Sequence, residues 1–257
     1  MATNPAYERV KAARANQRPT GLDYIGGIFT DFFELHGDRR SGDDAAIVGG
    51  VAYLDEMPVT VLAIEKGHNA KSRLERNFGA PSPAGYRKAL RLMQQAEKFH
   101  RPVLCFVDTS GARCDIEAET QGQGQAIAEN LTTMAGLKTP IISVLIGEGG
   151  SGGALALALS DRVWILENAV YSVISPEGCA SILWKDSKKV KDAAESLRLT
   201  AQDMLELGVV EQVIPEEKEF SLTYAKLQEE LEAALSQLGQ LPVEELLEQR
   251  YQRFRKY

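Results

Sequence analysis

The glycine-rich segment at residues 146–160 constrains the fold of this chain more than any other stretch. An apolar, β-branched run at Ile141–Ile146 leads into a cluster of five glycines, and the chain leaves the cluster as a short Ala/Leu helix. Glycines at such a junction leave backbone N–H groups unshielded at a helix start, where unpaired donors and the positive dipole end favour negative charge. The segment therefore predicts a place where an anion, permanent or transient, lies against the main chain.

Length and charge narrow the class of protein. A chain of 257 residues can bury a large core, and a single α/β domain is expected. The net charge of −7 argues against nucleic acid or an anionic membrane as the main partner. Cys105, Cys114 and Cys179 lack metal-ligand spacing, so we expect no metal site in this chain and a reducing compartment. Because no signal-peptide pattern and no stretch of transmembrane length occurs, we expect a soluble, cytoplasmic protein.

A local basic cluster contrasts with this acidic total. Each member alone fits a solvated helix face, whereas together they also fit a site for a phosphate or a cofactor tail. The members are Lys66, Lys71, Arg73, Arg76, Arg87, Lys88 and Arg91.

Hydrophobic periodicity predicts a regular succession of helices and strands. After residue 100 the chain repeats a unit of strand, loop and helix, and its strands are apolar runs without strict alternation. Such runs indicate strands that are covered on both faces, as in a mostly parallel sheet. The expected elements are an arm at 1–20, helices at 22–35, 86–100, 124–134, 176–185 and 200–207, a helical stripe from 222 that Pro242 interrupts, strands at 47–54, 59–64, 103–107, 141–146, 163–166 and 209–214, and a polar loop at 65–82.

The glycine cluster allows three chemical interpretations. Residues 147–152 match the dinucleotide pattern G-x-G-x-x-G, with Glu167 where a ribose-binding acid would lie, but this pattern alone is weak. Residues 149–153 match the nucleophile elbow G-x-S-x-G, although all three histidines precede the segment and leave Lys185 as the nearest downstream base for Ser151. An oxyanion hole of backbone N–H groups needs no catalytic side chain and suits a chain with few histidines best. A turn that serves only strand-to-helix packing is the structural alternative.

Longer motifs in fixed order resemble a known family. Residues 147–156 (GEGGSGGALA), followed by residues 171–185 (YSVISPEGCASILWK), closely resemble the carboxyltransferase alpha subunit of bacterial acetyl-CoA carboxylase. Shorter stretches at 35–39, 44–50, 76–79 and 85–93 agree as well. The resemblance runs from Leu22 to Pro215.

The resemblance implies a fold and a set of partners. The fold would be α/β and crotonase-like, a superhelix of ββα units at residues 22–215, with an N-terminal arm at 1–21 and a C-terminal helical extension at 216–257. A beta subunit of the same fold, carrying the acetyl-CoA site and a zinc ribbon, would complete an α2β2 tetramer. Biotin carboxylase and a biotin carboxyl carrier protein would supply carboxybiotin, since this chain has no biotinyl-lysine motif.

The activity implied is transfer of the carboxyl group to acetyl-CoA, giving malonyl-CoA in the first committed step of fatty acid synthesis. The alternatives are a non-catalytic crotonase-fold scaffold and a carboxyltransferase with another acyl-CoA acceptor.

Negative charge would develop on the ureido oxygen of biotin, and the alpha subunit would stabilise it. We expect the N–H groups of Gly153 and Ala154 to form this oxyanion hole, with Gly152 supplying the turn. Further candidates on the carboxybiotin side are Gly111, Ala112, Gly149, Gly150, Ser151, Pro176, Glu177 and Gly178, although Pro176 and Glu177 also fit an ordinary helix start.

One loop departs from the family pattern. Relatives usually read GAYPG and then AEERGQ after the third major strand, whereas residues 108–123 here read DTSGARCDIEAETQGQ. Gly111, Ala112, Glu119 and Gly122 are kept, but the Tyr-Pro-Gly segment is absent. The resemblance places this loop beside the biotin side of the site. Cys114 has no histidine nearby in sequence, so we interpret it as a loop thiol.

Overall fold

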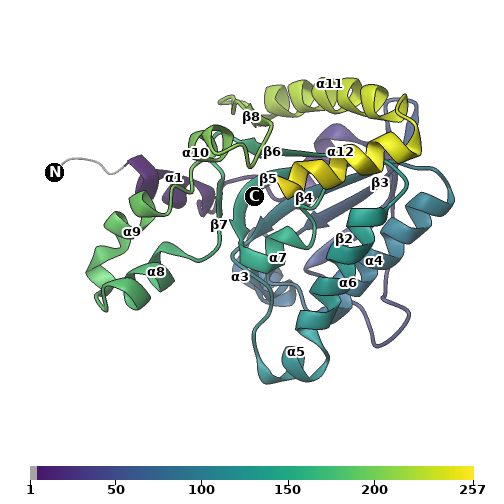
Figure 1. Cartoon of the computed structure of the whole chain (residues 1–257). Helices are drawn as coiled ribbons and strands as arrows, with labels where there is room; N and C mark the ends of the chain where they lie inside the picture. The colour runs from purple at the N-terminus through teal and green to yellow at the C-terminus, as the bar shows by residue number, and fades with distance from the viewer. Residues whose placement is uncertain (1–4) are drawn as a thin grey trace.

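A single eight-stranded sheet organises the chain, of which the computed structural model describes residues 5–257 (Figure 1). The strand order is β1-β2-β3-β4-β5-β6-β8, and β7 pairs with the far end of β5. The pairs β1–β2 and β2–β3 are antiparallel, whereas β3–β4, β4–β5, β5–β6 and β6–β8 are parallel. The strands are β1 (Thr30–Glu34), β2 (Ile47–Leu54), β3 (Met57–Ile64), β4 (Val103–Thr109), β5 (Ile141–Gly150), β6 (Arg162–Leu166), β7 (Val170–Ser172) and β8 (Gln212–Ile214).

Helices connect the parallel strands and cover the sheet. The helices α4 and α6 pack together, with α4 lying on β2 and β3, while α2 packs on β3 and β4 and contacts α11. The helices are α1 (Pro5–Ala13), α2 (Gly21–Ile28), α3 (Ala70–Glu75), α4 (Pro83–Lys98), α5 (Ile116–Thr120), α6 (Gln123–Gly136), α7 (Ser151–Leu155), α8 (Pro176–Leu183), α9 (Val190–Ser196), α10 (Ala201–Glu206), α11 (Phe220–Gly239) and α12 (Val243–Arg255), with short 3-10 turns η1 (Asn77–Gly79) and η2 (Ser187–Lys189).

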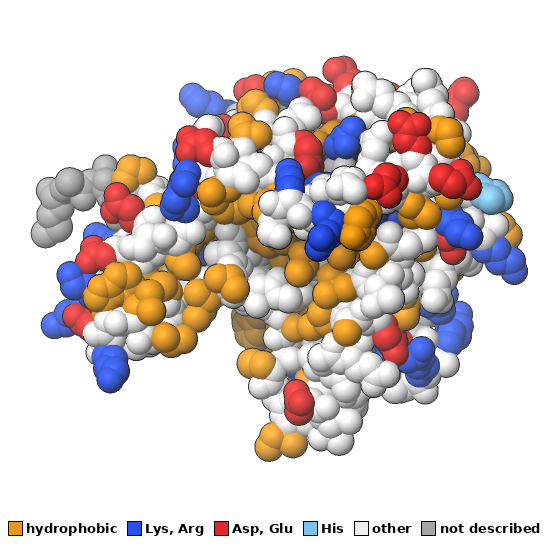
Figure 2. All heavy atoms as spheres, in the orientation of Figure 1, with side chains coloured by type: hydrophobic (Ala, Val, Ile, Leu, Met, Phe, Trp, Pro, Cys, Tyr) orange, Lys and Arg blue, Asp and Glu red, His pale blue; other side chains and the backbone are white. Residues whose placement is uncertain are grey.

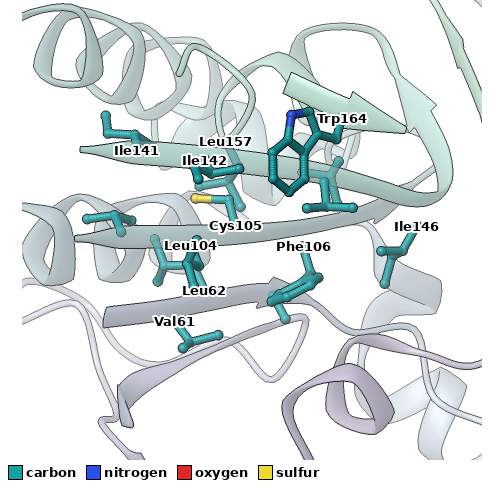
Figure 3. Packing of buried hydrophobic residues seen from close by; sticks show 14 of the residues in the cluster. Val61, Leu62, Leu104, Cys105, Phe106, Ile141, Ile142, Ile146, Leu157 and Trp164 are labelled. Carbon is teal, nitrogen blue, oxygen red and sulfur yellow. The ribbon is translucent and has the colours of Figure 1, made fainter. Parts of the chain in front are cut away.

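The core lies around the central strands, as their apolar runs predict. Every residue of β4 is buried, and Val61, Leu104 and Ile142 lie opposite one another on three adjacent strands. Figure 3 shows how side chains from these strands, including Phe106 and Trp164, pack as successive rows. Covering both faces of the sheet with helices explains why the strands show no alternation.

The C-terminal helices belong to this same core. Leu227, Leu231, Leu235 and Leu238 of α11 are buried in the main apolar cluster, so the predicted leucine stripe packs on its own chain. The guanidinium of Arg250 fixes α12 by pairing with the buried carboxylate of Asp161 at 2.8 Å.

A side lobe (residues 176–196, comprising α8, η2 and α9) projects from the body of the molecule, at the left of Figure 1. It has a small apolar cluster of its own, and α1 packs against α9 through buried Val10 and Ala13. Figure 2 shows apolar side chains gathered on the lobe surface, where Ile182 and Leu183 are each 67% exposed.

Several predicted elements need correction. The helix expected over 22–35 ends at Ile28, and its second half is strand β1, because residues 30–34 pair with the edge of β2. The loop expected at 65–82 contains α3 and η1, and the short elements α5, α9 and β7 were not predicted. The last strand begins at Gln212 and not at 209. In the described part of the chain, no helix is both long and apolar enough to span a bilayer.

Candidate active site

The glycine segment forms the end of β5 and the start of α7. Strand β5 continues to Gly150, beyond the predicted end at Ile146, and α7 begins at Ser151. The backbone of Ser151 has φ +52°, a left-handed conformation that is unusual for a residue with a side chain. In a helix that begins there, the N–H groups of residues 151–153 precede the first intrahelical hydrogen bond, and Ala154 occupies the next position. Backbone N–H groups without an intrahelical partner therefore collect at this turn.

The turn packs directly against the loop after β4. A Cβ on Gly150 would lie 2.3 Å from the carbonyl carbon and oxygen of Ser110, and a Cβ on Gly153 would lie 2.4 Å from the amide nitrogen of Ala112. Only glycine permits such close approach of backbone to backbone. The buried Tyr86 hydroxyl donates a hydrogen bond to the carbonyl oxygen of Gly153 at 3.0 Å and so helps to hold the turn in place. The structure thus brings the predicted loop residues and the predicted turn residues together.

Asp108 anchors the preceding part of the segment. Its Oδ1 accepts a hydrogen bond from the backbone N–H of Glu148 at 2.9 Å, and its Oδ2 lies 2.5 Å from the Lys66 Nζ. A Cβ on Gly147 would lie 2.3 Å from the carboxylate. Glycine at 147 therefore makes room for the buried acid that ties the ends of β4 and β5 together.

An apolar cavity of about 350 Å³ opens beside the turn. It lies between α7, β7 and the segment from Leu197 to Val209. Ser151 and Gly152 form one end of it, and the remaining wall is mainly apolar. Burial raises the pKa of Tyr171 in this wall to about 12, so the phenol stays neutral. The lining residues are Ser151, Gly152, Leu155, Tyr171, Ser172, Val173, Leu197, Met204 and Val209.

The start of α8 lies beside the same turn. Pro176 lines a small second cavity together with Gly149, Gly150 and Ser151. Pro176 is the first residue of α8, and the hydroxyl of Ser175 accepts a hydrogen bond from the N–H of Gly178 at 3.1 Å. These residues therefore show the helix-start arrangement, and the Gly178 N–H is already occupied.

Arg14, which the sequence interpretation missed, connects these parts. Its Nε donates to Glu148 Oε1 at 2.7 Å, and its Nη1 donates to Glu177 Oε1 at 2.7 Å. The hydrogen bond from Arg14 lowers the pKa of the Glu177 carboxyl. Because Arg14 lies 134 and 163 positions from these partners, no local sequence pattern indicates the contact.

The basic cluster divides into structural and cavity-facing members. Lys88 is buried, with its Nζ 2.5 Å from Asp43 Oδ1, and Arg76, Arg87 and Arg91 donate to backbone carbonyls. Lys66 and Arg73 instead line a cavity of about 220 Å³ that also includes Arg14, Phe78, Ser110 and Glu148.

The other interpretations of the glycine cluster find little support. Helix α7 has five residues, too short for the helix that follows a dinucleotide-binding turn. Within residues 5–257, the Ser151 hydroxyl has no hydrogen bond with a histidine or lysine side chain. The carboxylate of Glu167, the expected ribose-binding acid of the dinucleotide interpretation, lies 3.7 Å from the guanidinium of Arg9. A nucleophilic serine needs a base within hydrogen-bonding distance.

Hydrogen bonds and ion pairs among its own residues hold the altered loop. Asp115 accepts a hydrogen bond from the N–H of Ala118 and caps α5, and Arg113 pairs with Asp115 at 2.6 Å and with Glu117 at 2.9 Å. Cys114 is exposed in this loop.

Comparisons with known proteins agree with this architecture. A family profile described as "Acetyl co-enzyme A carboxylase carboxyltransferase-like" matches residues 3–257. The acetyl-coenzyme A carboxylase carboxyl transferase subunit alpha of Ruminiclostridium cellulolyticum is 58% identical over 252 residues, covering 98% of this chain and 97% of the relative. The protein of the same name from Streptococcus equi subsp. equi is 56% identical over 249 residues, covering 96% and 97%.

Solved structures confirm the expected crotonase-like fold. A transcarboxylase 12S structure, with hydrolysed methylmalonyl-coenzyme A bound, superposes with a TM-score of 0.74 at 18% identity, over 93% of this chain and 45% of that one. A Pseudomonas malonate decarboxylase hetero-tetramer, in complex with coenzyme A, has a TM-score of 0.66 at 21% identity, over 82% of this chain and 86% of that one. From the profile match and the relatives at more than half identity, the chain belongs to the family of acetyl-CoA carboxylase carboxyltransferase alpha subunits.

Proposed function

We propose that the glycine turn is the alpha-subunit half of a carboxyltransferase site. The family reaction transfers the carboxyl group from carboxybiotin on a carrier protein to acetyl-CoA and yields malonyl-CoA. One observation supports the assignment to the turn: the backbone of Gly150 and Gly153 meets the loop at Ser110–Ala112 too closely for any side chain, and Ser151 and Gly152, which lie between them in the chain, line an apolar cavity.

The chemistry of this cavity fits biotin. Biotin presents an apolar bicyclic ring with one polar ureido edge, and the cavity has an apolar wall with backbone donors at one end. When carboxybiotin gives up its carboxyl group, it supplies a ureido oxygen that carries negative charge. Leu155, Val173 and Met204 would hold the ring.

Preorganised N–H groups at the turn would stabilise the negative charge without reorganising at the moment of reaction. Gly153 is the main donor of this proposal, because it lies within the first turn of α7, where N–H groups have no intrahelical partner. Gly152 lines the cavity and is the second proposed donor. Ala154 lies at the position where backbone N–H groups usually begin to form intrahelical hydrogen bonds.

The proposal includes the partners that complete the enzyme. A beta subunit in an α2β2 tetramer would provide the acetyl-CoA site and a zinc ribbon, and biotin carboxylase with the carrier protein would deliver the carboxyl group in the cytoplasm. Two kinds of finding support an assembly: the relatives are named "subunit alpha", and the structural neighbours are titled as a hexamer assembly and a hetero-tetramer.

Two substitutions at Gly153 test the oxyanion hole. Gly153→Pro removes the N–H donor, whereas Gly153→Ala adds a Cβ and keeps the donor. Each variant is co-expressed with the cognate beta subunit and assayed for malonyl-CoA formation and for malonyl-CoA decarboxylation with free biotin. We expect the proline variant to lose about 10²-fold or more in kcat relative to the alanine variant, as for other lost oxyanion donors.

Melting temperatures and size-exclusion chromatography establish that both variants fold and bind the beta subunit. Both variants place a Cβ against the Ala112 nitrogen and so carry the same steric cost, and equal kcat values that are measurable above background would exclude the Gly153 N–H as a donor. An inactive wild-type complex that assembles stably would favour the scaffold or a different acyl-CoA acceptor.

A further inference from the structure

A chain of linked charged residues borders the glycine turn. It runs from Glu177 at the start of α8, through Arg14 after α1, to Glu148 within β5. The backbone N–H of Glu148 then reaches Asp108, whose carboxylate lies against the Lys66 ammonium group. The chain therefore connects the arm, the side lobe and the carboxyl ends of β4 and β5.

Arg14 is the central member of this chain. Its Nε donates to Glu148, and Nη1 and Nη2 donate to the two oxygens of Glu177 at 2.7 and 3.3 Å. Such two-point pairing orients the guanidinium as well as binding it. The Arg14 side chain is 34% exposed and that of Glu148 is 19% exposed, so solvent screens the first pair only partly. Arg14 also lines the cavity that contains Ser110.

Removing Arg14 would leave two carboxylates uncompensated beside the turn. Glu148 immediately precedes Gly149 and Gly150, and Glu177 follows Pro176, which lines the cavity with the turn residues. Lys66 is already paired with Asp108, and Arg73 donates its Nε to the carbonyl of Gly67. These two cations line the cavity that contains Ser110, and in the described part of the chain neither forms an ion pair with Glu148 or Glu177. Uncompensated negative charge near the N–H donors opposes any negative charge that forms there.

We propose that Arg14 is a positioning residue for carboxyl transfer, which neutralises Glu148 and Glu177 so that negative charge can form at the glycine turn. This inference rests on the proposed function of the turn. Arg14 acts through the two carboxylates and the turn, and it does not itself contact the reacting atoms. A purely structural tie between α1 and the side lobe is the competing explanation, and the experiment separates the two.

The test uses four forms of the chain in complex with the beta subunit: wild type, Arg14→Met, Arg14→Lys, and the triple variant Arg14→Met/Glu148→Gln/Glu177→Gln. For the methionine variant we expect kcat to fall about tenfold at low salt with little change in KM for acetyl-CoA, the order of magnitude that an unbalanced charge produces in a partly screened site. The lysine variant should recover part of the loss. The triple variant should recover most of the lost kcat, because it removes the two uncompensated charges. It does so without restoring the link that Arg14 makes between the end of α1 and the side lobe.

Ionic strength provides a second readout. Raising the ionic strength to about 0.5 M should reduce the difference in kcat between wild type and the methionine variant. Salt shortens the range over which the two carboxylates repel negative charge at the turn. A methionine variant with wild-type kcat would overturn the proposal. A triple variant as slow as the methionine variant would also overturn it and would establish the structural tie. The Gly153→Pro variant serves as a reference, since normal activity in that variant would instead refute the proposed site itself.

Discussion

Arg250→Met tests how the C-terminal helix is fixed to the core. The Arg250 side chain is buried, and its guanidinium makes five hydrogen bonds, two to Asp161 and three to the carbonyl oxygens of Met134, Leu137 and Thr139. These carbonyls belong to the end of α6 and the loop that follows it. One side chain therefore joins α12 to α6 and to the loop before β6.

The expected cost follows from this burial. Removing one partner of a buried ion pair typically costs about 3–5 kcal/mol, because the other charge is left without compensation. Within residues 5–257, the Asp161 carboxylate would keep one donor, the N–H of Ile141, which donates to its Oδ2 at 2.7 Å. For a domain of this size, such a loss corresponds to a decrease in melting temperature of about 10 °C. Methionine keeps an apolar side chain of similar length, so the cavity left behind is small.

Thermal and urea unfolding of the isolated chain measure the effect. Arg255→Met is the matched control, because Arg255 lies exposed on the same helix, and we expect it to change stability by less than about 0.5 kcal/mol. Adding Asp161→Asn to Arg250→Met should recover part of the loss, since no charge is then left unpaired. An Arg250→Met protein within about 1 kcal/mol of wild type would refute the view that this pair anchors α12.

Three shorter predictions concern the turn and its surroundings. Gly150→Ala should reduce kcat about 10²-fold, because the turn and Ser110 must separate by about 1 Å to admit the Cβ, whereas Gly136→Ala, with open space around it, should be active in the same assay. Tyr86→Phe should lower the free energy of unfolding by about 1–3 kcal/mol in urea titrations, because a buried carbonyl loses its donor. Burial disfavours the Asp38 charge, but backbone donors outweigh this and lower its pKa to about 2. Since its stabilisation is complete above the ordinary pKa of 3.8 and lost as pH falls towards 2, the stability gap between wild type and Asp38→Asn should close over that range in pH-dependent unfolding.

Local sequence determined the central sheet and the glycine turn. The apolar runs at β4, β5 and β6 predicted buried parallel strands, and five glycines between a strand and a helix predicted exposed backbone donors. Both predictions depend only on neighbouring residues: burial on two faces removes alternation, and glycine removes the Cβ that would shield the main chain.

Tertiary structure decided the elements whose local pattern was ambiguous. Residues 30–34 continue an apolar stripe that also suits a helix, and only pairing with β2 makes them a strand. Loop segments such as 65–82 were too short and polar for periodicity to reveal α3 and η1. Short elements gain their stability from contacts made elsewhere in the chain.

The same division applies to the site. The sequence by itself indicated Gly150 and Gly153, because a backbone site requires glycine wherever two stretches of main chain touch. The family resemblance, and not any local spacing, associated Gly111 and Ala112 with the turn, and nothing in the sequence indicated Arg14, since these contacts join residues far apart in the chain. Spacing along one segment determines which backbone groups are exposed, whereas only the folded sheet decides which distant charges surround them.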